Sequence, residues 1–349
     1  MIDNLFIVES PLQALMAVEL NLQFSGQSNG IIYRLSGKGR ERNDDQICKV
    51  IELCNWDFKE PVKFGIGGGV LWHFNARRYI FKAREKFKNG VRNLFLGEFR
   101  AQWMHAIRSV INPGNTVLMD DGAATVTMNR KYLSNNINYP EDIFHNKENF
   151  RSKIKNLFFL RLLDFQVLSK PLLTASAFLG DHSDYPIDFS GILGRKKYNP
   201  TSPGKNAFFF GSKYSEAGIV SRDYELIFIS NVKKYYDNRD LSFIYCAHRD
   251  ESFEKLDLIK ALFNIDIIIP ELPAELFLIE RAEDVGAISA AYSSVLNNLR
   301  FIFPSLLITS FMLDLEEVNE INRRDIEGIY EYFEKNGISV ERNFDLANF

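Results

Sequence analysis

Short apolar runs alternate with segments of helical periodicity over the first part of the chain. The runs cover 5–8, 31–33, 62–64, 93–96 and 116–119, and helical spacing of apolar residues follows at 11–22 and 70–87. Continuous apolar runs of this length are typical of strands buried on both faces, as in parallel sheets. The alternation therefore predicts parallel βα units over the first ~120 residues.

The same alternation stops near residue 123 and restarts after residue 204. Residues 198–204 are dense in Pro, Gly, Ser and Asn, which predicts a linker. Further apolar runs follow at 207–210, 243–247, 267–269, 285–288 and 306–309, with helices expected at 222–236, 274–281 and 324–336. We therefore expect an α/β protein with two domains, 1–200 with an irregular or helical insertion from about 123, and 205–349 with a C-terminal helix. One large sheet with a helical insertion is the alternative.

Composition limits the classes of function. The 349 residues are 46% hydrophobic and include 30 Phe, which is enough for two cores, and the net charge of −3 gives no reason to expect a nucleic-acid partner. Cys48, Cys54 and Cys246 lack metal-ligand spacing and leave an odd thiol, which favours a reducing cytoplasm. The start of the chain lacks signal-peptide features, and no apolar stretch reaches the ~18 residues of a membrane-spanning helix. We expect a cytoplasmic protein, at most peripheral to the inner membrane.

Asp120, Asp121 and Gly122 directly follow the apolar run 116–119. Adjacent side chains on a strand point to opposite faces, so one carboxylate can face a ligand while the other binds backbone N–H groups of the following turn. Gly122 permits a sharp turn and close approach of a ligand. A carboxylate at this edge of a sheet can deprotonate an attacking hydroxyl. Capping of the next helix is the structural alternative.

The second half of the chain carries two further candidate groups. His248 and Arg249 follow the run 243–247, where a protonated imidazole can donate to a phosphate. Ser293 and Ser294 precede an expected helix, where hydroxyl and N–H groups can surround an anion. The structural alternatives are an internally satisfied His and a plain helix cap.

Two other patterns are set aside. The glycine-rich segment 65–69 has Val70 in place of the last glycine of a dinucleotide-binding fingerprint, so a tight turn is the better interpretation. Asn43, Asp44 and Asp45 are interpreted as a helix start. Because no Asp-x-Asp motif ends a strand, we expect neither a metal nor a bound cofactor.

Taken in order, Asp120-Asp121-Gly122, His248 and Ser293-Ser294 resemble the bacterial sialyltransferases of the GT-B type, which share D/E-D-G, His-Pro and Ser-Ser/Thr motifs. The lipooligosaccharide sialyltransferases and capsule polysialyltransferases are the most similar families. The segments 9–13 (Glu-Ser-Pro-Leu-Gln) and 272–275 (Leu-Pro-Ala-Glu) also resemble theirs, and the likeness spans positions 5 to about 300. The chain departs from the pattern at Arg249, which stands where the family has proline.

The resemblance implies the GT-B fold, two facing Rossmann-like αβα domains with a cleft between them. It implies inverting, metal-independent transfer of sialic acid from CMP-sialic acid to a hydroxyl of a bacterial surface glycan (lipooligosaccharide, O-antigen or capsule). Asp121 would be the base, with Asp120 as the fallback. His248 would stabilise the leaving phosphate, with Arg249 as an added phosphate contact. The remaining donor-binding residues would be Ser293, Ser294, Glu275, Gly211 and Ser212.

Basic and apolar residues interleave between 147 and 170, for example Lys147, Arg151, Lys153 and Lys155 among Phe150, Leu157 and Phe158. Such a helix can lie on anionic lipid beside a lipid-linked acceptor. Packing against the first domain or against a second subunit is the alternative, and the second subunit would give a homodimer.

Three rival functions remain open from the sequence. The donor can be another CMP-activated ulosonic acid, of the Kdo or legionaminic/pseudaminic type. The chain can be a catalytically silent nucleotide-binding subunit of a polysaccharide assembly complex. A UDP-sugar epimerase of similar architecture would bind UDP in place of CMP.

Overall fold

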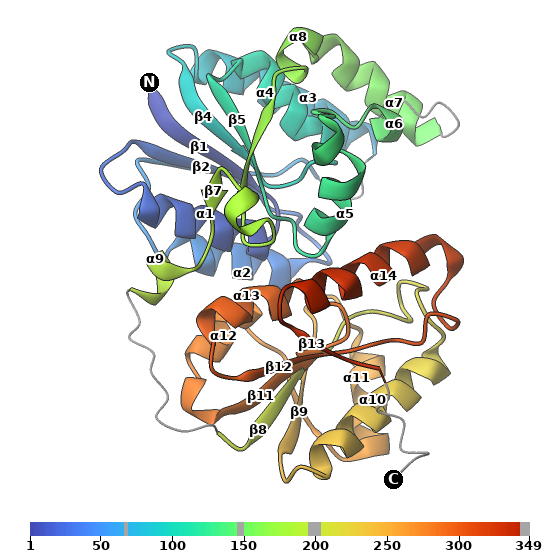
Figure 1. The fold of residues 1–349 in the computed structure, drawn as a ribbon. Coiled ribbons are helices and arrows are strands. Elements are labelled where there is room, and N and C mark those ends of the chain that lie inside the picture. Colours follow the sequence, from blue (N-terminus) through green and yellow to red (C-terminus); the bar gives the residue numbers. More distant parts are fainter. Residues whose placement is uncertain (66–68, 145–149, 195–203, 343–349) are drawn as a thin grey trace. The chain divides into compact units, whose positions relative to one another are not determined.

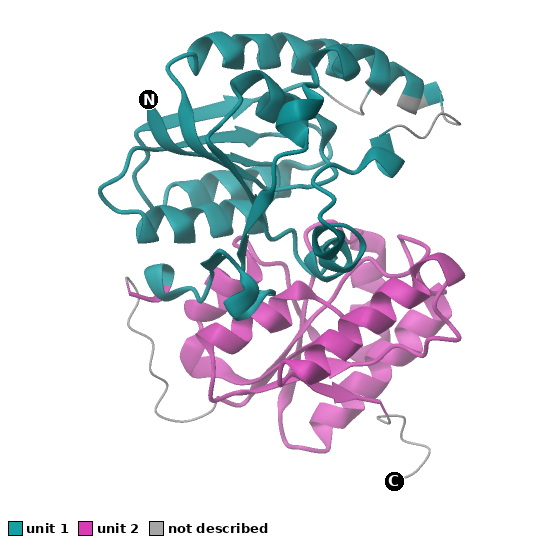
Figure 2. Ribbon diagram, turned by 45° about the horizontal axis from the view of Figure 1, so that its top comes forward, with its two compact units in different colours: residues 1–192 teal, residues 193–349 magenta. Residues whose placement is uncertain are grey.

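The computed structural model describes residues 1–65, 69–144, 150–194 and 204–342. The chain divides into two compact units, Met1–Ile192 and Leu193–Phe349, each with its own sheet (Figure 2). The alternative of one large sheet is therefore wrong. The predicted linker at 198–204 falls almost entirely outside the described residues, as does the centre of the glycine-rich segment 65–69.

Unit 1 contains a seven-stranded parallel sheet, sheet A, with the order β3-β2-β1-β4-β5-β6-β7 (Figure 1). The chain runs outward from β1 in one direction and then returns to β4 on its other side, so the strand order reverses between β1 and β4. The strands are β1 (Ile2–Val8), β2 (Asn29–Arg34), β3 (Phe58–Val62), β4 (Val91–Leu96), β5 (Asn115–Met119), β6 (Leu172–Ser176) and β7 (Tyr185–Pro186).

Helices cover both faces of sheet A (Figure 1). The longer ones are α1 (Pro11–Gln23) and α2 (Glu41–Ile51) on one face, and α3 (Val70–Lys86), α4 (Gln102–Ile111) and α7 (Phe150–Phe159) on the other. The shorter helices are α5 (Ala124–Lys131), α6 (Glu141–Phe144), α8 (Phe165–Leu168) and α9 (Ser190–Leu193), with 3-10 turns at Leu133–Asn135, Leu160–Leu162 and Gly180–His182.

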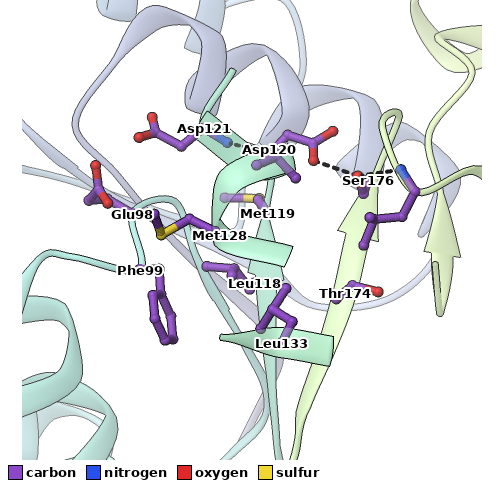
Figure 3. A pocket seen from close by; sticks show the side chains of 12 residues that line it. Glu98, Phe99, Leu118, Met119, Asp120, Asp121, Met128, Leu133, Thr174 and Ser176 are labelled. Carbon is purple, nitrogen blue, oxygen red and sulfur yellow. Dashed lines mark hydrogen bonds between the residues drawn. The ribbon is translucent and has the colours of Figure 1, made fainter. Parts of the chain in front are cut away.

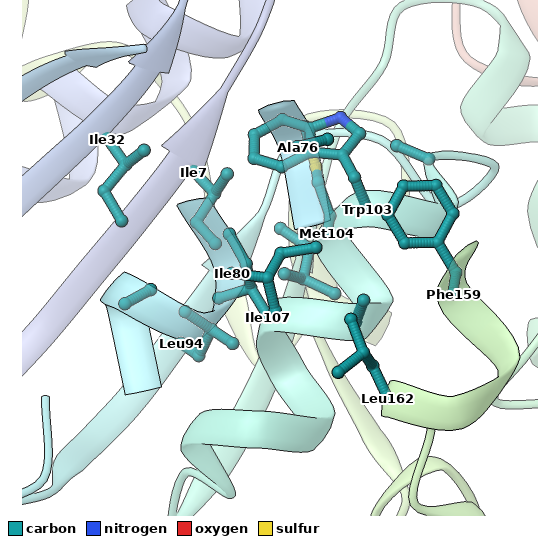
Figure 4. Close-up of a cluster of buried hydrophobic side chains, with 14 of the residues drawn as sticks. Ile7, Ile32, Ala76, Ile80, Leu94, Trp103, Met104, Ile107, Phe159 and Leu162 are labelled. Carbon is teal, nitrogen blue, oxygen red and sulfur yellow. The ribbon is translucent and has the colours of Figure 1, made fainter. Parts of the chain in front are cut away.

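The core under α3 and α4 is formed by alternate residues of the central strands together with the inner faces of these helices (Figure 4). Ile7 and Leu94 from the sheet meet Ile80 of α3 and Ile107 of α4, all fully buried. Phe159 of α7 is 1% exposed in the same cluster. Of the predicted basic and apolar segment 147–170, residues 147–149 lie outside the described residues, and α7 runs from Phe150 to Phe159 with its inner side packed on unit 1.

Unit 2 contains a six-stranded parallel sheet, sheet B, with the order β10-β9-β8-β11-β12-β13. The strands are β8 (Asn206–Phe210), β9 (Ser242–Cys246), β10 (Asp266–Ile268), β11 (Val285–Ala290), β12 (Leu307–Phe311) and β13 (Ser339–Glu341). The helices are α10 (Arg222–Asp237), α11 (Phe253–Phe263), α12 (Ala274–Ile279), α13 (Ser294–Ile302) and α14 (Glu320–Lys335), with a 3-10 turn at Ala282–Asp284.

Three elements or segments differ from the expected ones. The third strand ends at Val62, the first residue of the run 62–64 that predicted it. Helix α14 begins at Glu320 because Asn319 caps it by accepting from the N–H of Asn322 at 2.9 Å. Segment 123–204, expected to be irregular, adds β6 and β7 to the edge of sheet A. Among the described residues, no helix is long and apolar enough to cross a membrane.

Candidate functional site

In unit 1, polar side chains gather at the carboxyl end of sheet A, where the strand order reverses. Glu9 follows β1, Glu98 follows β4 and Asp121 follows β5. Because β1, β4 and β5 are neighbours in a parallel sheet, their carboxyl ends meet at one edge. The reversal point of such a sheet is where ligands bind in open α/β folds. This edge is the candidate site of unit 1.

Gln13 crosses this edge from the first turn of α1. That helix begins with Ser10 as its cap and Pro11 in the first position, which suits its missing N–H. The amide oxygen of Gln13 accepts from the N–H of Glu9 at 2.8 Å, and its Nε2 donates to Oδ1 of Asp121 at 2.8 Å. Gly97 makes room for it, because a Cβ there would lie 2.7 Å from Cδ of Gln13.

Asp121 lies in a carboxyl pair with Glu98, which also binds Arg100. The two carboxyl groups hydrogen-bond to each other, and Arg100 binds Glu98 at 3.0 and 3.1 Å and Asp121 at 3.3 Å. Burial and the nearby Glu98 raise the pKa of Asp121 well above its usual range. Burial alone would raise the pKa of Glu98, but the contacts with Asp121 and Arg100 outweigh it and hold that pKa below the usual range. Of the two carboxyl groups, Asp121 therefore holds a proton more readily than Glu98 does.

Asp120 points the other way and is held inside the unit. Its carboxylate accepts from the hydroxyl of Ser176 at 2.5 Å and from the N–H of Ala177 at 2.6 Å, and it is 1% exposed. Burial raises its pKa to about 6, although these hydrogen bonds oppose the shift. The expected split between the two carboxylates is observed, but the backbone partner lies after β6 and not in the following turn.

Figure 3 shows Glu98 and Asp121 directed to one side of β5 and Asp120 toward Ser176 on the other. A small pocket lies between them, with apolar walls that include Met119, Met128 and Leu133. Gly122 continues the chain with φ +68°, a conformation that favours glycine, and leads into α5. Asp121 keeps about a quarter of its side chain exposed (25%), so a small polar ligand can reach it.

In unit 2 the candidate residues also lie at the carboxyl ends of neighbouring strands. Gly211 and Ser212 follow β8, His248 comes shortly after β9, and Ser293 comes shortly after β11. In sheet B these strands stand side by side in the order β9-β8-β11, and the strand order reverses between β8 and β11. The structure thus brings these predicted residues to one edge of unit 2, the edge at which nucleotides bind in such sheets.

His248 is fixed by hydrogen bonds from its own turn. Its backbone N–H donates to Oε2 of Glu251 at 2.5 Å, and the N–H of Glu251 returns to the carbonyl of His248 at 3.0 Å. The ring nitrogen Nδ1 accepts from the N–H of Asp250 at 3.2 Å. An Nδ1 that accepts carries no proton, so in the neutral ring the proton lies on Nε2, the nitrogen that can donate to a ligand.

Buried charges support this turn. Glu251 accepts from the hydroxyl of Tyr245 at 2.7 Å and pairs with Lys255 at 2.8 Å, and its side chain is fully buried. Lys255 also binds Glu225 and donates to the carbonyl of Ser212 at 2.7 Å. Burial lowers the pKa of Lys255, but the two carboxylates raise it more, so the ammonium stays charged.

The ring of Tyr245 also explains why residue 211 is a glycine. A Cβ on Gly211 would lie 2.7 Å from Cε1 of Tyr245, so a larger residue would displace the tyrosine that holds Glu251. The expectation that Gly211 and Ser212 let a nucleotide approach remains a prediction. Packing under Tyr245 is the reason for Gly211 that the structure supplies.

The remaining predicted residues have structural partners. Ser293 caps α13 by accepting from the N–H of Val295 at 3.4 Å, and Ser294 is the first residue of that helix. Glu275, at the start of α12, is 4% exposed and accepts from Nδ2 of Asn298 at 2.7 Å. Burial raises its pKa, while the half-buried Arg249 lies near enough to oppose the shift. Their roles toward a donor stay predictions.

Glu98, Arg100 and Gln13 were not among the residues predicted from sequence to act at the site. Glu98 follows an apolar run and a glycine, the same kind of position that singled out Asp120 and Asp121, so it could have been found. Glu251 belongs to the charged cluster that follows the run 243–247 beside His248, whereas Lys255 carried no such signal. Among the described residues, no group of three or more His, Cys, Asp or Glu side chains could hold a metal ion; the expectation of metal-independence stays a prediction.

No family model matches the sequence, and no curated protein matches it. Solved structures do resemble it. An α/β-galactoside α-2,3-sialyltransferase from Photobacterium phosphoreum has a TM-score of 0.51 at 14% identity, with 97% of each chain covered. A 2,6-sialyltransferase from Photobacterium sp. JT-ISH-224, solved with CMP and lactose, has a TM-score of 0.50 at 13% identity over 97% of this chain and 78% of that one.

A UDP-GlcNAc 2-epimerase from Methanocaldococcus jannaschii, solved with UDP-GlcNAc and UDP, is similar to the same degree. Its TM-score is 0.52 at 12% identity, over 96% of this chain and 92% of that one. At these identities the likeness establishes the fold. The predicted fold class is confirmed: the chain consists of two Rossmann-like α/β units, the architecture that GT-B sialyltransferases and UDP-GlcNAc 2-epimerases share.

Proposed function

We propose that the protein is a glycosyltransferase that moves sialic acid from CMP-sialic acid to a hydroxyl of a bacterial surface glycan. The observation that carries the proposal is the carboxyl group of Asp121, held at the edge of sheet A by Gln13, Glu98 and Arg100 with a raised pKa. A general base works best when its pKa lies near the working pH. The fold shared with two sialyltransferases supports the donor class.

In the proposed reaction the acceptor oxygen attacks the anomeric carbon of the sialic acid and gives its proton to Asp121. The bond from that carbon to the phosphate oxygen breaks, and CMP leaves with the electron pair. His248 donates from Nε2 to the leaving phosphate, and the hydroxyls and N–H groups of Ser293 and Ser294 add donors. Donors fixed before the reaction stabilise the developing charge without reorganising. Attack on the face opposite the phosphate inverts the configuration.

Several features of the proposal rest on the sequence resemblance. The acceptor is a lipooligosaccharide, O-antigen or capsule glycan, and the enzyme works in the cytoplasm at the inner membrane. No metal is required, because CMP leaves readily once its phosphate is held. Glu275 accepts from the ribose hydroxyls. Arg249 replaces the proline of the resembled motif. This replacement favours a variant of the proposal in which the donor is an activated ulosonic acid of the Kdo or legionaminic/pseudaminic type.

A UDP-sugar epimerase is the second candidate, favoured by the equal likeness to the archaeal UDP-GlcNAc 2-epimerase. It predicts binding of UDP, conversion of UDP-GlcNAc and no release of CMP. A catalytically silent subunit predicts nucleotide binding without turnover of either donor.

The deciding experiment measures CMP release from CMP-sialic acid with and without lactose, in the presence and absence of EDTA. Acceptor-dependent release that survives EDTA and disappears in Asp121→Asn supports the proposal, provided that CMP binding by calorimetry is retained. Asp223→Asn, an exposed carboxylate in the first turn of α10, is the matched control and should keep full activity. Binding of UDP with no binding of CMP would overturn the donor assignment.

A further inference from the structure

Two neighbouring helices of unit 1 expose large apolar side chains. Leu71 and Phe74 of α3 are 70% and 54% exposed, and Phe150 and Leu157 of α7 are 74% and 67% exposed. Of the fifteen exposed large hydrophobic residues among those described, six lie on these two helices. Single exposed hydrophobic residues are normal, whereas a gathering of them indicates an interaction site.

The exposed residues follow helical spacing. On α3, Val70, Phe74, Arg78 and Phe81 are separated by four, four and three positions, which puts them on one face. The inner face of the same helix carries Ala76, Ile80 and Ala83 in the core. On α7, Phe150, Lys153 and Leu157 repeat the pattern. Both helices are therefore amphipathic in an unusual sense, because their outer faces combine apolar and basic side chains.

The two helices pack directly on each other (Figure 1). The guanidinium of Arg77 donates to the carbonyl of Phe158, whose ring lies 6.1 Å from that of His73, and the rings of Trp72 and Phe159 are 6.3 Å apart. We define the α3–α7 surface by the exposed residues Phe74, Arg78, Phe81, Lys82, Lys153 and Leu157.

The charge of this surface is opposite to that of the whole chain. α3 carries Arg77, Arg78, Lys82, Arg84 and Lys86 against the single acid Glu85, whereas the chain has a net charge of −3. Lys86 forms an ion pair with Glu60 at 3.1 Å, whereas Arg78 and Lys82 are exposed on the outer side of α3. A face that joins apolar side chains to basic ones has the chemistry of helices that lie in the headgroup region of anionic bilayers.

We propose that the α3–α7 surface binds the surface of an anionic phospholipid bilayer. Phe74, Phe81 and Leu157 enter the headgroup region, while Arg78, Lys82 and Lys153 meet lipid phosphates. A second copy of the chain fits this face poorly, because in a symmetric dimer this basic face would meet a copy of itself, whereas an anionic bilayer supplies the opposite charge. The inference does not require the proposed function; if both hold, the transferase works on an acceptor anchored in the same bilayer.

The test is cosedimentation with vesicles in the absence of any sugar donor. We expect the wild type to sediment with vesicles of equal parts phosphatidylcholine and phosphatidylglycerol, more weakly in high salt, and not with phosphatidylcholine alone. Phe74→Ser with Phe81→Ser, and separately Arg78→Gln with Lys82→Gln, should each weaken binding about tenfold or more. The matched control is Ile227→Ser with Lys233→Gln on α10 of unit 2, where Ile227 is 59% exposed, and it should bind as the wild type does.

Unfolding midpoints and CMP binding, measured on the same variants, distinguish a lost surface from a lost fold. Absence of wild-type binding to anionic vesicles at low salt overturns the inference. The inference is also overturned if the wild type is a dimer, the Phe74→Ser/Phe81→Ser variant is a monomer, and both bind vesicles equally. The α3–α7 surface would then join two copies of the chain. CMP release plays no part in these outcomes, so the failure of the proposed function would leave them intact.

Discussion

Glu98 and Asp121 hydrogen-bond to each other through their carboxyl groups, at the carboxyl end of two adjacent strands. Two carboxyl groups in contact cannot both ionise without repulsion, so they hold one proton between them. Arg100 binds both oxygens of Glu98 and one of Asp121, which favours the ionised form of Glu98 more than that of Asp121. Glu98 therefore adjusts the basicity of its neighbour.

The acid limb of the pH–rate profile should move when Glu98 is neutralised. A base must lose its proton to act, so the raised pKa of Asp121 places the rise of kcat/KM at higher pH than for an ordinary Asp. Glu98→Gln removes the charge that contributes to this shift, so the limb should move to lower pH. The measurement is kcat/KM for CMP release against pH, with Glu254→Gln, whose side chain is 80% exposed, as the control. An unmoved limb in Glu98→Gln contradicts the role of the pair.

Asp120 should matter for stability and not for the reaction. Asp120→Ala leaves the hydroxyl of Ser176 and the N–H of Ala177 without their acceptor, which costs about 1–3 kcal/mol for each unpaired donor. Asp120→Asn keeps an acceptor of the same shape and should lose less. Urea unfolding of the three proteins measures the order, and CMP release per folded molecule should be similar in all of them. A fully stable but inactive Asp120→Ala would reverse the assignment of the two carboxylates.

Asp120 also makes a prediction about pH and stability. Its pKa is raised from 3.8 to about 6 in the folded protein, so the fold binds this proton more tightly than the unfolded chain does. Stability from this group is complete below 3.8 and is lost as the pH rises through about 6. The free energy of unfolding of the wild type minus that of Asp120→Asn should therefore fall across this range and then level off. A difference that increases with pH would contradict the burial argument.

The fold was predictable because its strands are continuous apolar runs and its helices have regular spacing. Most strands of both sheets were found in this way, with errors of a few residues at their ends. β6 and β7 were missed because β6 contains Thr174 and Ser176, β7 has two residues with Pro186, and neither follows a regular helix. β6 is defined by its pairing with β5, and β7 by its pairing with β6, and the local sequence contains neither partner.

Site residues could be predicted where they directly follow a strand in the sequence. Their roles could not be predicted where they depend on contacts with residues far away in the sequence. Asp120 and Asp121 were found together, but their division of roles depends on Ser176, 56 residues away, and on Gln13, 108 residues away. In the sequence, Gly97 and Gly211 cannot be distinguished from other glycines in turns. Each is small because a particular side chain, Gln13 or Tyr245, occupies the space above it.

Gly97 should be intolerant of a methyl group for this reason. Its φ lies outside the left-handed region, so alanine strains no backbone, but a Cβ would displace Gln13 from Asp121. We expect Gly97→Ala to lower CMP release and to cost about 1–3 kcal/mol of stability by overpacking. Adding Gln13→Ala should restore stability without restoring activity, a coupling that a double-mutant cycle measures. Gly69→Ala, where a Cβ meets nothing within 4 Å, is the control for activity.

Glu251 should act on the donor through His248. It accepts the backbone N–H of His248 in the turn where the resembled motif has proline, and Tyr245 and Lys255 hold it in place. Glu251→Gln cannot accept from His248 and Tyr245 and also pair with Lys255, although Lys255 keeps Glu225 and is not left unpaired. We expect CMP affinity to fall about tenfold, the value of one lost charge-assisted hydrogen bond. Nitrogen chemical shifts of the His248 ring should show less of the form protonated at Nε2.

In the His248→Ala background, Glu251→Gln should weaken CMP binding no further, because the group through which it acts is gone. An additional loss of the same size would mean that Glu251 supports nucleotide binding by another route. The control is Glu254→Gln, which neutralises an exposed carboxylate of α11 and should change neither the CMP affinity nor the His248 spectrum.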